Sequence, residues 1–316
     1  MSKRLSLKET AEFIKERDNF LILSHEHPDG DTLCSGAALC SALRRTGKRA
    51  CCHNNPEISE RYLSYVENYL GEPEEGDICY ISVDVADQKM LPYHRDIDID
   101  LVIDHHGSNT GYGKRLLLNA ENAACGELVY RLILELGCSL TEEEANLLYI
   151  AVTTDTGCFR YTNTNASCLS TAAELVVAGA DQKGINVKFF RSNSRARIAI
   201  YARMYSEIGY HLDGRVTSSI LTADLISSVG ATEDDLEDIA HIPGSVDIAE
   251  VAIFVRELSG GRMKVSLRAR PGFDVSRLAR LYGGGGHPGA AGFKSDLAPE
   301  KIIDMLVSEI ERIWKQ

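Results

Sequence analysis

The sequence lacks long apolar runs and has few aromatic residues. Aromatic residues make up 7% of the 316 positions, with a single tryptophan, although hydrophobic residues in total reach 44%. No stretch approaches the roughly 18 consecutive apolar residues of a membrane-spanning helix. Residues 1–10 also lack the apolar core that a signal peptide carries. We therefore expect a globular, cytoplasmic protein that does not bind membranes.

Paired cysteine motifs are missing as well. The nine cysteines are odd in number, and no two of them form a Cys-x-x-Cys pair. This usage fits reduced thiols in the cytosol better than a disulfide framework. We expect Cys34, Cys40, Cys51, Cys52 and Cys79, which lie in or beside predicted core elements, to pack as small apolar side chains.

Positive charge is scarce overall but concentrated in one segment. The chain has 34 Lys and Arg against 46 Asp and Glu, a net charge of −12. Residues 1–190 hold 18 basic and 29 acidic residues, whereas residues 255–294 hold eight basic and two acidic ones, balances of −11 and +6. Because phosphate contacts supply most non-specific affinity for nucleic acid, an acidic chain is a poor binder of long duplexes. A local basic segment instead suits a small anionic substrate brought to bound metal ions.

The order of strand and helix signals predicts an α/β protein with two domains. Short apolar runs alternate with helical stretches, which is typical of a doubly wound, mostly parallel sheet. The runs cover 20–24, 78–83 and 100–103, and the helical stretches cover 32–45, 128–136 and 141–154. Strand pairs at 210–221 and 249–267 and helices at 276–282 and 299–314 then predict a smaller α/β domain with a mixed sheet. The predicted parts are residues 1–184, a connecting helix at 185–209, and residues 210–316.

The run SHEHPDGD at residues 24–31 places an imidazole and two carboxylates where a strand ends and a helix begins. That position is the usual ligand-binding edge of an open α/β sheet. A loop tightened by the proline and glycine can point His25, Asp29 and Asp31 at one place. These donors suit Mn²⁺, Fe²⁺, Mg²⁺ or Zn²⁺. The alternative is a polar turn in which Asp29 only caps the following helix.

Three further polar positions follow core elements. Asp84 follows a short strand, Asp104-His105-His106 follows another, and Asp155 ends a helical stretch. Each alone has a simple alternative as a cap, a solvated carboxylate or a surface turn. Together with the first motif they gather carboxylates that would repel one another without cations. Two divalent ions about 3.5–4 Å apart, sharing one carboxylate, would neutralise them and activate a water.

A glycine-rich run, GGGGHPGAAG, occupies residues 283–292. Consecutive glycines let backbone N–H groups approach phosphate oxygens without a Cβ in the way. His287 can add a donor, and Arg268 and Arg270 come from the strand just before the run. The alternative is a flexible linker, although linkers rarely continue through His into apolar residues.

These motifs, in this order and over nearly the whole chain, resemble the DHH phosphoesterase superfamily. The closest resemblance is to the two-domain NrnA type, bacterial oligoribonucleases that also dephosphorylate 3′-phosphoadenosine 5′-phosphate (pAp). The matching residues are His25-x-x-x-Asp29-x-Asp31, Asp84, Asp104-His105-His106, Asp155 and Gly284-Gly285-Gly286-His287.

The resemblance implies a site with two divalent metal ions, usually Mn²⁺. His25, Asp29 and Asp84 would hold one ion. The second would be held, with Asp84 bridging, by Asp31, Asp84, His105 and Asp155. His106 would lie beside the scissile phosphate and Asp104 would orient the histidines. Substrate would be bound by Gly284, Gly285, Gly286, His287 and Arg268, with Arg270 and Arg191 as weaker candidates.

We therefore predict a metal-dependent phosphodiesterase and phosphatase with its active site in the cleft between the domains. It would degrade short oligoribonucleotides to 5′-mononucleotides and convert pAp to AMP. One alternative is hydrolysis of linear or cyclic signalling dinucleotides such as pGpG, pApA or c-di-AMP. Another is a non-catalytic nucleotide sensor, which would be expected to have lost a metal ligand. The resemblance also suggests a homodimer.

Overall fold

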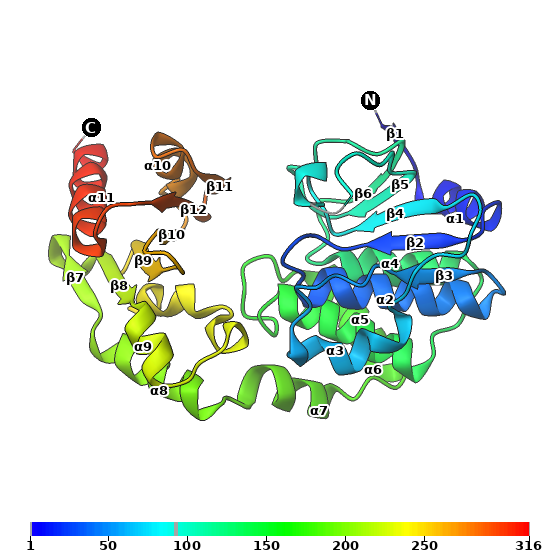
Figure 1. Cartoon of the computed structure of the whole chain (residues 1–316), viewed down its shortest axis with the longest axis horizontal. Helices are drawn as coiled ribbons and strands as arrows, with labels where there is room; N and C mark the ends of the chain where they lie inside the picture. The colour runs from blue at the N-terminus through cyan, green and yellow to red at the C-terminus, as the bar shows by residue number, and fades with distance from the viewer. Residues whose placement is uncertain (1, 92–93, 316) are drawn as a thin grey trace. The chain divides into compact units, whose positions relative to one another are not determined.

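The computed structural model describes residues 2–91 and 94–315 and divides into two compact units (Figure 1). The N-terminal unit is Met1–Ser192 and the C-terminal unit is Asn193–Gln316. The boundary falls inside the segment for which a connecting helix is predicted. None of the helices in the described ranges is long and apolar enough to cross a membrane.

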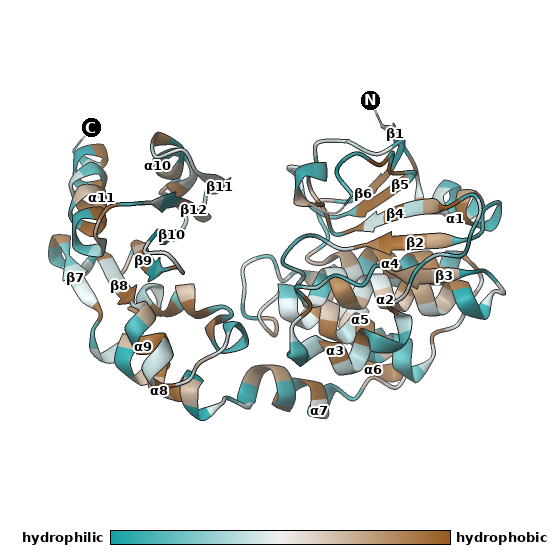
Figure 2. Ribbon diagram, viewed as in Figure 1, coloured by the Kyte–Doolittle hydropathy of each residue, from teal (hydrophilic) through white to brown (hydrophobic). Residues whose placement is uncertain are grey.

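The N-terminal unit is built on a six-stranded sheet in which every strand pairing is parallel. The strand order is β1-β6-β5-β4-β2-β3. The strands are β1 (Lys3–Arg4), β2 (Phe20–Leu23), β3 (Ala50–Cys52), β4 (Cys79–Val83), β5 (Leu101–Asp104) and β6 (Arg115–Leu118). Figure 2 shows how apolar β2 is, as expected for a strand buried on both faces. The parallel sheet confirms the predicted α/β class.

The helices of this unit pack on one face of the sheet. They are α1 (Leu7–Lys15), α2 (Gly30–Arg45), α3 (Glu60–Val66), α4 (Cys125–Glu135), α5 (Glu142–Asp155) and α6 (Ala166–Val177). Their buried side chains form one hydrophobic cluster with strand residues such as Phe20 and Ile22.

The opposite face of the sheet is covered differently. Leu21 and Leu23 pack there with Val85, Leu91 and Ile99, and no described residue of this cluster belongs to an α-helix. The fold therefore differs in one respect from a doubly wound sheet, which has helices on both faces. The physical reason is that Val85, Leu91 and Ile99, from the loop between β4 and β5, bury the apolar side chains of this sheet face in place of a helix.

The cysteines behave as small apolar residues. All nine are free thiols, and seven of them are buried. Cys51 and Cys52, adjacent in β3, pack in the two clusters on opposite faces of the sheet.

Local sequence signals explain several helix boundaries. The Thr141 hydroxyl and the Glu144 side chain form the predicted capping box at the start of α5. Helix α2 begins two residues before the predicted start because Asp29 caps it. Helix α4 begins at Cys125, three residues earlier than predicted, without a side-chain cap of its own.

Two helical segments replace the single connecting helix predicted at 185–209. Helix α7 (Gln182–Asn186) continues as a π-helical turn, Val187–Arg191, and α8 (Arg195–Ser206) begins after a break. Ser194 caps α8 by accepting a hydrogen bond from the Arg197 amide at 2.9 Å. Serine and asparagine between the segments favour such caps over helix continuation, which accounts for the break.

The C-terminal unit contains a second six-stranded sheet, of order β11-β12-β10-β9-β8-β7. The β8–β9 pairing is parallel and the others are antiparallel, which confirms the predicted mixed sheet. The strands are β7 (Gly209–His211), β8 (Val216–Leu221), β9 (Val251–Glu257), β10 (Met263–Ala269), β11 (Gly285–His287) and β12 (Ala290–Ser295).

Helical segments pack on both faces of this second sheet. Helices α10 (Val275–Leu281) and α11 (Pro299–Trp314) pack on one face, and α11 shows alternating apolar and polar colours in Figure 2. On the other face, α8, α9 (Ala223–Ser228) and the 3₁₀ segment Ile239–Ser245 pack around Phe254 and Leu221.

The glycine-rich run is partly a strand rather than wholly a loop. Gly285–His287 forms the edge strand β11, paired with β12. A Cβ at Gly284 would lie 2.1 Å from the carbonyl oxygen of Gly292, and Gly286 has a φ of 140°. Glycine is therefore required here for the close pairing of the two strands, in addition to any role with a ligand.

Candidate metal centre

Six predicted ligand side chains come together at the carboxyl ends of strands β2, β4 and β5 and at the adjoining ends of α2 and α5. Together with His106 they form three overlapping groups, and the ligand atoms within each group lie within 4.8 Å of one another. The groups are His25 with Asp29 and Asp84, Asp31 with His105 and Asp155, and Asp84 with His105 and His106. The residues come from four separate stretches of the chain, and the parallel sheet brings them to one edge.

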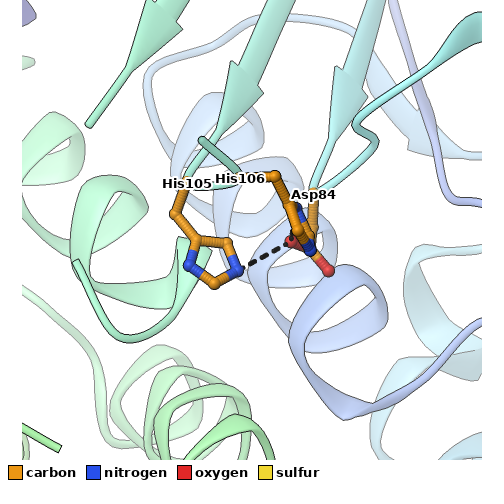
Figure 3. Close-up of side chains that lie close together, drawn as sticks. All are labelled: Asp84, His105 and His106. Carbon is orange, nitrogen blue, oxygen red and sulfur yellow. Dashed lines mark ion pairs between the residues drawn. The ribbon is translucent and has the colours of Figure 1, made fainter. Parts of the chain in front are cut away.

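Asp84 belongs to two of these groups, and Figure 3 shows it beside His105 and His106. Its Oδ1 is 3.3 Å from His105 Nε2 and 3.4 Å from His106 Nδ1, and its Oδ2 is 4.0 Å from His25 Nε2. Asp84 also has a left-handed φ of 61°, a strained conformation for a residue with a Cβ. The two carboxylate oxygens therefore face two different sets of donors.

The surroundings of the Asp84 Oδ1 atom show whether the site fits a cation. It is buried and has no hydrogen-bond partner among the described residues. A buried carboxylate oxygen without a partner is costly unless a positive charge compensates for it. The surrounding carboxylates and imidazoles are donors that divalent cations of the first transition row accept. The residues present therefore fit divalent metal ions.

Asp29 serves two purposes at the start of α2. Its Oδ1 accepts hydrogen bonds from the backbone amides of Asp31 and Thr32, at 3.0 and 3.1 Å. Its Oδ2 lies 3.8 Å from His25 Nε2. The helix-cap alternative is thus correct for one oxygen, while the other oxygen faces the histidine.

His105 is held with one ring nitrogen toward the carboxylates. Its Nδ1 is 3.1 Å from the carbonyl oxygen of Asn122, which fixes the proton on Nδ1. Its Nε2 lies 3.8 Å from Asp31 Oδ2 and 3.5 Å from Asp155 Oδ2. A backbone carbonyl behind the ring is the usual support of a metal-binding histidine.

Asp31 is fixed by the N-terminus of another helix. Its Oδ2 accepts a hydrogen bond of 2.6 Å from the Cys125 amide, and its Oδ1 accepts bonds of 2.9 Å from the Gly126 amide and the Ser35 hydroxyl. Asp31 thus takes the place of a side-chain cap for α4, at the positive end of the helix dipole. Sequence reasoning did not identify these donors, because about 95 residues separate Asp31 from the start of α4.

Asp104 holds His106 in place. Its Oδ1 accepts a 2.8 Å hydrogen bond from His106 Nδ1 and another from the His105 amide, and its Oδ2 accepts a 2.6 Å bond from Asn109 Nδ2. The carboxylate is completely buried. Asn109 is a second residue that sequence reasoning missed, and its only signal was its short distance from Asp104 along the chain.

Two of the crowded carboxylates, those of Asp84 and Asp155, keep their protons to a higher pH than an ordinary aspartate does. Burial and the charge of Asp31 raise the pKa of Asp84 well above its usual range, and the same causes raise the pKa of Asp155 to about 7. Burial alone lowers the pKa of His105, but the close carboxylates of Asp84, Asp31 and Asp155 raise that pKa to about 11. The centre is therefore short of positive charge, which divalent cations would supply.

The predicted substrate-binding residues have different environments. Arg268 and His287 both pair with Ala290, so they lie in one row across β10, β12 and β11. The Arg270 guanidinium donates to the carbonyl oxygens of Asp247 and Val246, at 2.6 and 3.1 Å, and is engaged in holding that loop. Arg191 is exposed at the end of the π-helical turn of the N-terminal unit.

Two family models match this chain. Residues 19–152 match the N-terminal domain of the DHH family, and residues 217–316 match the DHHA1 domain. The chain is 31% identical over 299 residues to a bifunctional oligoribonuclease and PAP phosphatase NrnA of Thermus thermophilus, covering 92% of this chain and 90% of the relative. It is 24% identical over 306 residues to the protein of the same name from Bacillus subtilis, covering 95% and 96%.

Solved structures share the fold. An exopolyphosphatase-related protein from Bacteroides fragilis has a TM-score of 0.84 at 23% identity, covering 98% of this chain and 97% of that one. RecJ from Thermus thermophilus in complex with Mn²⁺ has a TM-score of 0.55 at 14% identity, covering 96% of this chain and 54% of RecJ.

Proposed function

The chain belongs to the DHH family, and on that premise we propose that it is a divalent-metal-dependent hydrolase of short oligoribonucleotides and of pAp. The products would be 5′-mononucleotides and AMP. The observation that carries the proposal is the buried carboxylate of Asp84, whose Oδ1 has no hydrogen-bond partner among the described residues and faces His105 and His106, while its Oδ2 faces His25. Similarity to relatives named for both activities supports the choice of substrates.

We assign two cation positions to the N-terminal unit. One would be held by His25, Asp29 and Asp84, and the other by Asp31, Asp84, His105 and Asp155. The bound cations would withdraw charge from the phosphoryl oxygens and lower the pKa of a water. Mn²⁺ is the ion we favour, since RecJ with Mn²⁺ shares the fold and a probable manganese-dependent inorganic pyrophosphatase of Streptococcus mutans is 26% identical over 176 residues.

His106 would donate a hydrogen bond to the phosphate under attack. Burial alone lowers the pKa of His106, but the hydrogen bond to Asp104 and the charge of Asp84 raise it above its ordinary value. Because Asp104 accepts from Nδ1, the second N–H of the imidazolium, on Nε2, is left for a substrate oxygen. His106 would then stabilise the negative charge that develops during phosphoryl transfer.

Residues of the C-terminal unit would bind the substrate. Arg268 and His287 lie in one row, and the exposed strand β11 offers a backbone with little side-chain bulk. A Cβ at Gly285 would meet nothing within 4 Å, so the space beside this strand is open. Arginine and histidine donors with accessible glycine amides are suited to a phosphate group.

The decisive experiment measures product release with Mn²⁺ from pAp and from a 5′-labelled diribonucleotide. We expect AMP and phosphate from the first and mononucleotides from the second. Asp84→Asn should lower both rates by about 10³-fold or more, because one oxygen of a shared ligand loses its charge. Asp98→Asn is the matched control, since that side chain is 89% exposed and lies outside the centre.

Two results would contradict the proposal. A protein that releases product from neither substrate lacks the proposed function, and an Asp84→Asn variant with full activity excludes the proposed centre. Including pGpG and c-di-AMP in the substrate panel separates this function from the turnover of signalling dinucleotides.

A further inference from the structure

Three cationic side chains form a row across the second sheet. Lys264 in β10 pairs directly with Arg256 in β9 on one side and with Lys294 in β12 on the other. Directly paired residues present their side chains on the same face of a sheet, so the three cations are neighbours. Like charges in such positions destabilise strand pairing. The arrangement is therefore unfavourable for the fold alone.

The charges in this row are only partly balanced. Arg256 forms an ion pair with Glu233 at 2.5 Å. In the part of the chain that the structure describes, neither Lys264 nor Lys294 has an ion-pair or hydrogen-bond partner for its ammonium group. Burial and the charges of Arg256, Lys294 and Arg268 lower the pKa of Lys264, against the charge of Glu233, which raises it. The two lysines thus share one face of the sheet, and the nearby carboxylate of Glu233 is already paired with Arg256.

The cationic row lies on the same face as the row of Arg268 and His287. Lys264 and Arg268 are four residues apart in β10, and residues separated by an even number point to the same side of a strand. At about 3.3 Å per residue, the two rows are about 13 Å apart. A single phosphate group is too small to contact both.

Small residues form the surface between the two rows. Ser266 pairs with Gly292, and Gly292 pairs with Gly285. On the same face, α8, α9 and the 3₁₀ segment Ile239–Ser245 pack on Leu221 and Phe254, and Phe254 pairs with Ser266. Toward the edge of the sheet the side chains at positions 292 and 285 are absent, and a Cβ at Gly285 would meet nothing within 4 Å. The surface between the two rows is therefore low over β12 and β11, and cations lie at both of its ends.

We propose that Arg256, Lys264 and Lys294 bind a second phosphate of an oligonucleotide whose first phosphate lies at Arg268 and His287. This inference rests on the proposed function and adds a preference for substrate length to it. One duplex strand carries a phosphate about every 3.4 Å along its axis, and an unstacked strand spaces its phosphates further apart, so at most about four nucleotides span the two rows. A pentanucleotide would engage both rows, whereas pAp and a dinucleotide would engage only one.

The test compares the full-length protein with its Lys264→Gln/Lys294→Gln variant on substrates of different length. We expect KM for a pentaribonucleotide to rise about 5- to 20-fold and KM for pAp and a dinucleotide to stay within about twofold. A second measurement uses a fluorescent pentanucleotide and adds Asp84→Asn to both proteins, so that the nucleotide is not hydrolysed. The plot of the logarithm of the binding constant against the logarithm of the salt concentration should become shallower by about one unit in the lysine variant. Lys301→Gln, an exposed charge change on α11, is the matched control.

The outcomes separate this inference from the proposed function. An unchanged pentanucleotide KM, or an equal rise for all three substrates, would overturn the second phosphate site. A protein that binds the pentanucleotide through these lysines but hydrolyses nothing would refute the proposed function while keeping the site. The variant should fold with an unchanged or higher Tm, since it removes repulsion between paired cations.

Discussion

At the scale of single residues, the centre depends on conformations that residue types alone do not reveal. The sequence identified Asp84 as a ligand candidate from its position after a strand. It did not reveal the left-handed φ of 61° that turns this residue, nor that its Oδ1 has no hydrogen-bond partner among the described residues. Such strain persists where surrounding structure enforces it and is common at functional sites.

Asp104→Asn tests how His106 is positioned. The amide keeps the size of the carboxylate but loses the charge that helps to raise the pKa of His106. We expect kcat to fall about 10- to 100-fold and the alkaline limb of the pH–rate profile to move to lower pH, with little change in metal affinity. Steady-state rates across pH, with Mn²⁺ titrations, measure both effects. A large loss of metal affinity in this variant would instead indicate that Asp104 binds the cation itself.

Gly30→Ala tests the close approach of α2 to α5. A Cβ at Gly30 would lie 2.5 Å from the Oγ1 and 2.7 Å from the Cγ2 of Thr154. We expect a loss of about 1–3 kcal/mol in the free energy of unfolding from this overpacking. Urea denaturation of the single variants and of Gly30→Ala/Thr154→Ala forms a double-mutant cycle, in which the second change should recover most of the loss. Additive effects would contradict the predicted clash.

At the scale of elements, prediction succeeded where the signal was local. The amphipathic pattern of 299–314 and the capping box of Thr141 and Glu144 placed α11 and α5 correctly. The expected strands do not include β1, β3 or β6, whose pairings join distant residues; Lys3 and Arg115, for example, are 112 positions apart. They also do not include β11 and β12, since glycines give no strand signal without the paired strand beside them. These strands form because of pairing with strands that are distant in the sequence or lack a local signal of their own.

Thr141→Ala tests the capping box of α5, the helix that ends at Asp155. The change removes the oxygen that accepts the Glu144 amide at 3.1 Å. We expect the free energy of unfolding to fall by about 1 kcal/mol and kcat to stay unchanged, since the cap is at the opposite end of the helix from Asp155. Urea denaturation and rate measurements check this, with the exposed Thr162→Ala as control. A loss of activity without a loss of stability would contradict it.

At the scale of the whole molecule, the charge of the metal centre links stability to pH. With metal removed by a chelator, Asp155 with a pKa of about 7 and His105 with a pKa of about 11 bind protons that the unfolded chain releases at lower pH. Both pKa values are raised in the folded state, so the stabilisation that these two groups supply is greatest at low pH and is lost as pH rises. Asp155 makes the stability depend on pH up to about pH 7, and His105 does so above about pH 6.5.

Thermal unfolding from about pH 5 to 8 measures this linkage. We expect a decline of about 1.4 kcal/mol per pH unit for each extra proton held by the folded protein. Excess Mn²⁺ should raise Tm most at pH 8, because cations replace the retained protons. Asp155→Asn should flatten the chelated profile below pH 7, whereas Asp98→Asn should not. A chelated protein whose stability rises with pH would contradict the assigned charge states.

The division of the chain into two units also bears on how such enzymes diversify. All six proposed metal-binding residues lie between residues 25 and 155. The residues proposed to bind phosphate lie between 256 and 294: Arg256, Lys264, Arg268, His287 and Lys294. Mutations that change which substrate is accepted can therefore accumulate in one unit while the reaction chemistry is inherited intact in the other. A lineage can in this way acquire a new substrate without passing through an inactive ancestor.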